Sequence, residues 1–130
     1  MATNEIIFPY FENGVFAGVR VTLVDEDFVI APKDYQDGKM MSWRTAMDTL
    51  KAEGLTTWNY RQICLIMYFL NEINKVFEDN GGDNLNNWYW TCSEFTTDGA
   101  FKFDGRCGTL EALVKSSMWR IRPIKNLKAK

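Results

Sequence analysis

The hydrophobic residues of this chain change their spacing twice, and this change limits the possible folds more than any other feature. From Val15 to Val24 apolar side chains alternate, which is typical of a half-buried strand. Apolar residues then recur at helical spacing over about 43–53, after the N-cap candidate Ser42, and from about Thr57 to 79. The alternation returns in three short segments, 88–93, 100–103 and 118–124. Strands, two helices and strands again predict a compact α+β domain rather than a doubly wound sheet.

The segments that flank these elements are predicted from turn residues. Ile6 to Phe8 precede Pro9 and predict a short edge strand or an extended arm, so residues 1–13 are separated from a domain over 14–124. Phe28 to Ala31 closes a hairpin, and 34–39 is a loop without the spacing of a calcium loop. Residues 125–130 form a basic tail.

The expected core combines a mainly aliphatic helix stripe with tryptophans from several segments. One stripe on the second helix is widened by Tyr68 and Phe69 and contains Ile63, Ile66, Met67, Leu70, Ile73 and Phe77. Tyr89 and Trp90 point to opposite faces of a strand, so one can enter the core while the other lines the opposite surface. The tryptophans expected in the core are Trp43, Trp58, Trp90 and Trp119.

Composition restricts the class of protein. The 130 residues are 46% hydrophobic, which suits a single domain, and the longest apolar run, 63–70, is far shorter than a membrane span of about 20 residues. The chain has no histidine, which excludes Ser-His and Cys-His nucleophile pairs. The three cysteines, Cys64, Cys92 and Cys107, lack zinc-site spacing and are interpreted as buried small residues, with a Cys92–Cys107 bridge as the alternative. No metal and no cofactor is expected.

Charge is unevenly distributed along the chain. All 17 acidic residues precede residue 112, whereas the last 19 residues hold six basic residues and no acid. This basic strip predicts either a solvated terminus that complements the acidic body or a contact with an acidic protein surface. An overall net charge of −2 argues against dedicated nucleic-acid binding.

Several motifs occur in an order that is known from one family. They are Trp43 with Ala46, Trp58, Ile73-Asn74, Gly81-Gly82, Tyr89-Trp90-Thr91-Cys92-Ser93-Glu94, Ala100, Gly105 and Arg120-Ile121-Arg122-Pro123-Ile124. In this order the chain resembles, over about residues 14–124, the phage and bacterial C-type-lectin-like domains named after the C-terminal domain of the Legionella collagen-like adhesin. That family has a Tyr-Trp-Ser-Ser signature, where this chain has Thr91 and Cys92 in place of the serines. The turn after Trp58 also lacks the proline of the family.

The resemblance implies a C-type-lectin-like fold of two helices with a small, mainly antiparallel sheet, whose long irregular loops carry binding. The ligand-binding candidates in these loops are Asp83, Asn84, Asn86, Asn87, Trp88, Thr96, Asp98 and Arg106. Amides donate and accept hydrogen bonds and aromatic faces stack, which suits sugar hydroxyls or a protein partner. The alternative is that Asn, Asp and Gly gather there because turns need them. The calcium-binding strings of true C-type lectins are absent, so no calcium site is expected.

The expected function is that of a non-enzymatic structural or decoration protein of a phage virion, which binds a host-surface glycan or another virion protein. No export signal is visible, and virion proteins assemble in the host cytoplasm without one. Attachment to other virion proteins, in a homo-oligomer, is assigned to Ile6, Ile7, Phe8, Arg120, Arg122, Lys125 and Lys128. The alternative is a bacterial cell-surface or secreted adhesin-type module. An enzyme of the formylglycine-generating kind, which shares a lectin-like fold, would depend on a reactive cysteine pair, and none is predicted here.

Overall fold

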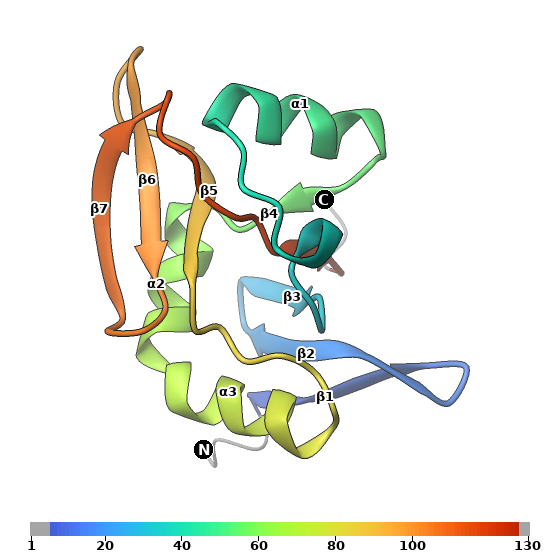
Figure 1. The fold of residues 1–130 in the computed structure, drawn as a ribbon. Coiled ribbons are helices and arrows are strands. Elements are labelled where there is room, and N and C mark those ends of the chain that lie inside the picture. The colour runs from blue at the N-terminus through green and yellow to red at the C-terminus, as the bar shows by residue number, and fades with distance from the viewer. Residues whose placement is uncertain (1–5, 128–130) are drawn as a thin grey trace.

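The computed structural model describes residues 6–127 and has three helices and two antiparallel sheets (Figure 1). The predicted α+β class is therefore confirmed. Among the described residues no helix has the length and apolar character needed to cross a membrane.

The larger sheet has five strands in the order β1-β2-β3-β8-β4. These strands are β1 (Ile7–Glu12), β2 (Val15–Leu23), β3 (Glu26–Ile30), β4 (Thr56–Thr57) and β8 (Pro123–Asn126). Every neighbouring pair is antiparallel, so Ile30 of β3 pairs with Val19 on one side and with Ile124 on the other. The strand nearest the C-terminus thus lies inside the sheet formed by the N-terminal hairpin. β1 is an edge strand, which is one of the two structures that the sequence left open for this segment.

The helices are α1 (Trp43–Ala52), α2 (Tyr60–Tyr68) and α3 (Leu70–Asp79). α1 agrees with the predicted helix. The single helix predicted from Thr57 is wrong, because β4 and a capping box between Asn59 and Gln62 precede α2, and the chain bends at Phe69 (φ −106°, ψ 22°). Tyr68, next to the bend, has 81% of its surface exposed and does not widen the buried stripe. The bend still leaves both segments with buried residues against the core.

The smaller sheet consists of β5 (Trp88–Glu94), β6 (Gly99–Asp104) and β7 (Thr109–Val114) in that order. β7 was not predicted, since the sequence indicates a loop through Gly108. This edge strand is mostly exposed, and its hydrophobic alternation is weak because only Leu110 and Leu113 are turned partly inward. Pairing with β6, rather than local pattern, makes it a strand.

The segment that was predicted as one last strand, 118–124, joins the two sheets. Trp119 bridges to Met41, and Arg120 pairs in parallel with Tyr89 before regular pairing resumes in β8. The backbone N–H of Trp90 donates to the carbonyl of Arg120 (2.9 Å). The Tyr89 and Arg120 motifs therefore lie side by side.

Strand β5 is covered on both faces. Tyr89 packs against Trp58 and Phe103 in the larger core cluster, and Trp90 belongs to a second cluster with Trp43 of α1. Both Tyr89 and Trp90 are fully buried, so the prediction that one of them lines a surface is wrong. The reason is that α1 covers the face that the strand pattern alone leaves open.

The tryptophans follow the prediction with one exception. Trp43, Trp58 and Trp90 are buried, and their indole N–H groups donate to backbone carbonyls at 2.8, 3.0 and 2.9 Å. Trp119 is only half-buried. These bonds tie the helix regions to β5 and to the Met41 bridge.

The cysteines are free, and Cys64 and Cys107 are exposed. The prediction of three buried cysteines is therefore wrong for two of them. Cys92 is half-buried, and burial raises the pKa of its thiol.

Candidate functional site

One fully buried guanidinium organises the surface on which the predicted loop lies. Nε of Arg122 donates to the carbonyl of Ala31 (2.7 Å), and Nη1 donates to the carboxylate of Asp34 (2.9 Å). Nη2 donates to the carbonyl of Asp83, and the guanidinium lies over the ring of Phe77 at 4.7 Å. Arg122 thus joins the end of β3, the segment after it and the loop of residues 80–87. The prediction that Arg122 contacts a partner protein is wrong, because its side chain is fully buried and its charge is satisfied in the interior.

Asp34 is the acidic partner of this cluster. Its side chain is 11% exposed and also accepts hydrogen bonds from the Tyr89 hydroxyl (2.7 Å) and from Nη1 of Arg120 (3.4 Å). Burial, followed by the negative charge of Asp34, raises the pKa of Tyr89 far above its ordinary value. The phenol therefore remains a hydrogen-bond donor at neutral pH.

The start of the loop of residues 80–87 is fixed by backbone contacts. The N–H of Gly82 donates to the carbonyl of Phe77 (2.9 Å), and the N–H of Asp83 donates to the carbonyl of Pro32 (2.8 Å). A Cβ at Gly82 would lie 3.0 Å from Phe77 and 3.1 Å from Phe16. A larger residue would thus press the loop away from α3 and β2.

The end of the same loop is fixed from two other elements. The Asn74 side chain of α3 accepts from the N–H of Leu85 (2.7 Å), and the carbonyl of Asn87 accepts from the N–H of Gly105 (2.8 Å). A Cβ at Gly105 would lie only 1.8 Å from the carbonyl oxygen of Leu85, so only glycine fits there. The backbone bonds leave the polar side chains of the loop directed to its surface.

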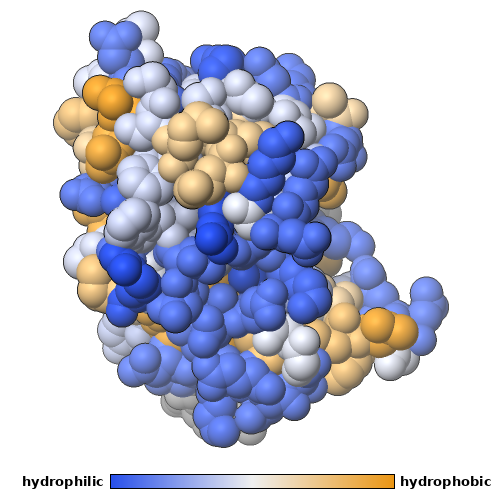
Figure 2. Space-filling view, in the orientation of Figure 1, coloured by the Kyte–Doolittle hydropathy of each residue, from blue (hydrophilic) through white to orange (hydrophobic). Residues whose placement is uncertain are grey.

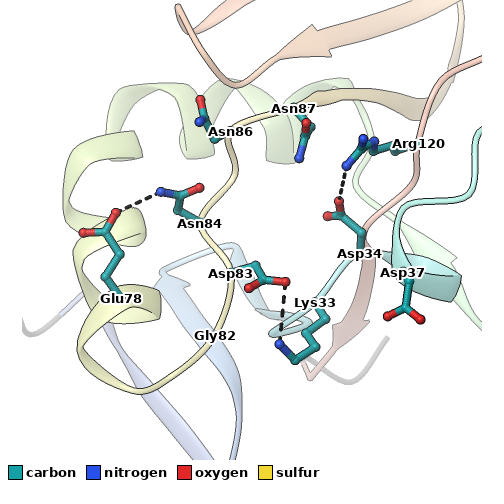
Figure 3. A pocket seen from close by; sticks show the side chains of 10 residues that line it. All are labelled: Lys33, Asp34, Asp37, Glu78, Gly82, Asp83, Asn84, Asn86, Asn87 and Arg120. Carbon is teal, nitrogen blue, oxygen red and sulfur yellow. Dashed lines mark hydrogen bonds and ion pairs between the residues drawn. The ribbon is translucent and has the colours of Figure 1, made fainter.

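These side chains form one wall of a cavity of about 500 Å³ (Figure 3). The cavity is lined by Lys33, Asp34, Asp37, Glu78, Gly82, Asp83, Asn84, Asn86, Asn87 and Arg120. Figure 2 shows hydrophilic residues over the part of the molecule where this loop crosses. Three pairs cross the cavity or its rim: Lys33–Asp83 (3.6 Å), Asn84–Glu78 (2.9 Å) and Arg120–Asp34 (3.4 Å). The lining is polar throughout, with more carboxylates than cations.

A second cavity of about 230 Å³ shares Asn87 and Arg120 with the first. Its other lining residues are Met40, Trp88, Arg106 and Trp119. The two cavities are therefore neighbours that share a border, and we refer to them as the polar cavity and the tryptophan cavity of one candidate site.

Six of the eight predicted ligand-binding residues come together in this site. Asp83, Asn84, Asn86 and Asn87 line the polar cavity, and Trp88 and Arg106 line the tryptophan cavity. The other two do not join them. Thr96 and Asp98 lie on the turn between β5 and β6 and border a separate depression with Phe95 and Leu113.

Sequence reasoning missed four residues of the polar cavity. Lys33, Asp34 and Asp37 lie in the segment interpreted only as a loop, and Glu78 lies at the end of α3. The only sequence signal was the charge cluster after Pro32. Arg120 was predicted to contact a partner, but its guanidinium lies between the two cavities.

The residues predicted to bind a partner are placed in different environments. Ile6 and Ile7 are buried in the larger core cluster, which contradicts their assignment to a contact surface. The physical reason is that β1 pairs with β2, so its inward side chains complete the core under α3. Phe8 is half-buried on the other side of β1, beneath the guanidinium of Arg20 at 5.6 Å.

The basic C-terminal residues are only partly described. Lys125 is exposed in β8, and its amine lies 3.0 Å from the carboxylate of Glu12. This ion pair raises the pKa of Lys125. Lys128 lies outside the described residues.

Within residues 6–127 no group of three or more acidic or cysteine side chains has the geometry to hold a metal ion. The side chains that line the two cavities offer hydrogen bonding, ion pairing and contact with tryptophan side chains. No protein-family model matches this chain, and no curated protein sequence matches it.

Proposed function

We propose that this protein is a non-enzymatic, C-type-lectin-like binding module that holds a glycan in the polar cavity. One observation carries the proposal: the amide-rich loop of residues 80–87 lines a cavity while its backbone is fixed by the buried Arg122. The loop is thus held in one conformation before any ligand arrives, which is what a pre-organised binding surface requires.

The lining chemistry suits a ligand rich in hydroxyl groups. Each Asn side chain provides two donors and one acceptor oxygen, and the carboxylates accept from sugar hydroxyls. Three amides, Asn84, Asn86 and Asn87, border the polar cavity. Its volume of about 500 Å³ is in the range of small-ligand sites. Since the loop is already ordered, binding loses little conformational entropy.

The arrangement of the motif-bearing segments supports a lectin-like fold. The Trp43 helix, the second helical region, the Tyr89 strand and the Arg120 to Ile124 segment follow one another as they do in the family that the chain resembles. The last segment closes the structure by pairing with Tyr89 and then with β3. The irregular loop of residues 80–87 is displayed beside this closure.

The setting that we propose is the surface of a phage particle, where many copies convert weak glycan contacts into avidity. The edge strand β1 supports assembly, because its outer edge pairs with no strand among the described residues. An adhesin-type module on a bacterial surface would use the same site. Mass spectrometry of purified phage particles tests the setting: detection of the chain supports it, and absence from the particles contradicts it.

Binding to a glycan array, followed by calorimetry with the best ligand, tests the function. We expect Asn86→Ala to weaken affinity about 5- to 10-fold, because the exposed amide contributes about 1 kcal/mol of hydrogen bonding. Asn71→Ala, an exposed amide on α3, is the matched control and should leave affinity unchanged.

A double variant, Thr96→Ala with Asp98→Ala, tests the location of the site. These residues lie on a different loop, so the variant should also bind normally. Absence of any glycan ligand, or loss of binding in the double variant but not in Asn86→Ala, would contradict the proposal.

A further inference from the structure

The tryptophan cavity differs from the polar cavity in charge. Two of its six lining residues are arginines, Arg106 and Arg120, and within the described part of the chain none is acidic. The polar cavity is bordered by four carboxylates, on Asp34, Asp37, Glu78 and Asp83. A ligand that occupies both cavities therefore meets a negative field at one end and a positive field at the other.

The aromatic wall of the tryptophan cavity is held rigidly. The rings of Trp88 and Trp119 meet edge to face with centroids 4.9 Å apart. The amine of Lys102 lies 4.9 and 4.5 Å from these two rings and forms an ion pair with Glu111 (2.8 Å). Because Lys102 is buried, this contact fixes the wall from beneath.

The first guanidinium is oriented but not saturated. Arg106 lies over the ring of Trp88 at 4.4 Å, and Oδ1 of Asp104 accepts from its backbone N–H (2.9 Å) and from its Nε (3.5 Å). Among residues 6–127, neither Nη atom of Arg106 has a hydrogen-bond acceptor in the protein. The side chain remains 56% exposed, so these donors are open to a ligand.

The second guanidinium, that of Arg120, lines the same cavity beside Asn87. Nη1 of Arg120 donates to Asp34 (3.4 Å) and, with the Asn87 amide oriented to satisfy both of its ends, to Oδ1 of Asn87 (3.1 Å). A Cβ at Gly38 would lie 2.9 Å from this Nη1, so the absence of a side chain there leaves room for the guanidinium. Nε and Nη2 of Arg120 form no hydrogen bond with any described residue.

We propose that the tryptophan cavity binds the carboxylate of an acidic sugar residue, such as a uronic or sialic acid. Arg106 and Arg120 both line this cavity and donate to the carboxylate, and Trp88, Trp119 and Met40 contact the C–H groups of the ring. This inference rests on the proposed glycan-binding function, since the rest of the glycan occupies the polar cavity. The carboxylates of the polar cavity determine the orientation of the bound glycan, because they repel its acidic end.

The test compares carboxylated polysaccharides with the same polymers after their carboxyl groups are reduced to alcohols. The panel is polygalacturonate, alginate, hyaluronan and polysialic acid, measured by biolayer interferometry near physiological salt. We expect at least one native polymer to bind about 10-fold more tightly than its reduced form. This is about the change in affinity expected when a hydrogen bond to a charged group is lost. If no native polymer binds better than its reduced form, the acidic-sugar inference is wrong.

Two variants separate a built site from general attraction to anions. Arg106→Gln should remove most of the preference for the native polymer. Arg44→Gln is the matched control, because Arg44 is also an exposed guanidinium over a tryptophan, 4.9 Å from the ring of Trp43, and should leave the preference intact. Equal loss in the two variants would show nonspecific attraction and overturn the inference.

The failure of this inference is distinguishable from failure of the proposed function. Reduced polymers or neutral array glycans that bind as well as native polymers would contradict only the acidic-sugar site. A chain that binds neither native nor reduced polymers, nor any neutral glycan, would contradict both.

Discussion

Two polar loops of this molecule have similar composition but very different anchoring. The loop of residues 80–87 and the turn of residues 95–98 are both rich in Asn, Asp, Thr or Gly with aromatic neighbours. The turn is held within its own sheet, by bonds from the N–H groups of Phe95 and Thr96 to the carbonyl of Gly99 and from the N–H and amine of Lys115 to the carbonyls of Asp98 and Thr97 (2.8 Å each). The loop is held by groups from α3, the end of β3 and Arg122. Polar composition marks both as surface loops, and both border a hollow. Only the loop of residues 80–87 is held by a buried guanidinium together with groups from α3 and from the segment after β3.

The largest expected effect comes from removing the anchor. Arg122→Met keeps the volume but leaves Asp34 without its closest ion-pair partner and frees the carbonyl of Asp83. We expect a loss of about 3–5 kcal/mol in the free energy of unfolding, measured by urea denaturation.

Two further variants make this experiment decisive. Arg122→Lys keeps the charge but cannot donate to Ala31, Asp34 and Asp83 together, so it should fall between wild type and Arg122→Met. Arg44→Met, at an exposed position, should change stability by less than about 0.5 kcal/mol. Equal stability of Arg122→Met and Arg44→Met would show that the clamp is not needed.

A pair of glycine variants compares the two loops directly. Gly105→Ala places a methyl group 1.8 Å from the carbonyl oxygen of Leu85, a backbone atom that can move only if the loop shifts. Gly99→Ala, at the turn, meets its nearest atoms at 3.3 Å. We expect Gly105→Ala to lose about 1–3 kcal/mol in urea denaturation and Gly99→Ala clearly less.

Ligand binding compares the same two glycine variants in a second way. Gly105→Ala should also weaken glycan affinity under conditions where the variant remains folded, because the substitution moves the cavity wall. Gly99→Ala should bind as wild type does. The opposite order of effects would show that the turn, not the loop, carries the site.

The elements follow from local sequence pattern, whereas the site does not. Alternation from Val15 and the spacing after Trp43 predict β2 and α1, since these patterns need only one buried face. Arg120 and Arg122 look identical in sequence, two residues apart on one predicted face. Their fates differ because Arg122 bonds to groups 91, 88 and 39 residues away, and no local pattern encodes such contacts.

The same limit explains the other corrections. β7 exists through its pairing with β6, and the burial of Trp90 on the face opposite Tyr89 depends on α1, which lies far away in the sequence. The loop of residues 80–87 was predicted as a binding surface from its amides. The opposite wall, around Asp34, could not be predicted, because it is brought to the loop only by the fold.

The smallest expected effect concerns pH and tests whether the anchor is a buried network. Burial and Asp34 raise the pKa of Tyr89 in the folded state above the ordinary value of 10.0, so the folded protein retains a proton that the unfolded chain loses. Stability from this group is therefore present below about pH 10 and decreases as the pH rises further. In Tyr89→Phe this decrease should be smaller, although the lost bond to Asp34 costs about 1 kcal/mol at neutral pH. Tyr68→Phe is the matched control, because Tyr68 is 81% exposed and its removal should change neither quantity. Urea midpoints of the three proteins at neutral and alkaline pH measure the difference, and parallel pH profiles for wild type and Tyr89→Phe would show that the phenol does not hold its proton in the folded state. Such a result would remove Tyr89 from the anchor and leave Arg122 and Asp34 as the contacts that distinguish the loop of residues 80–87 from the turn.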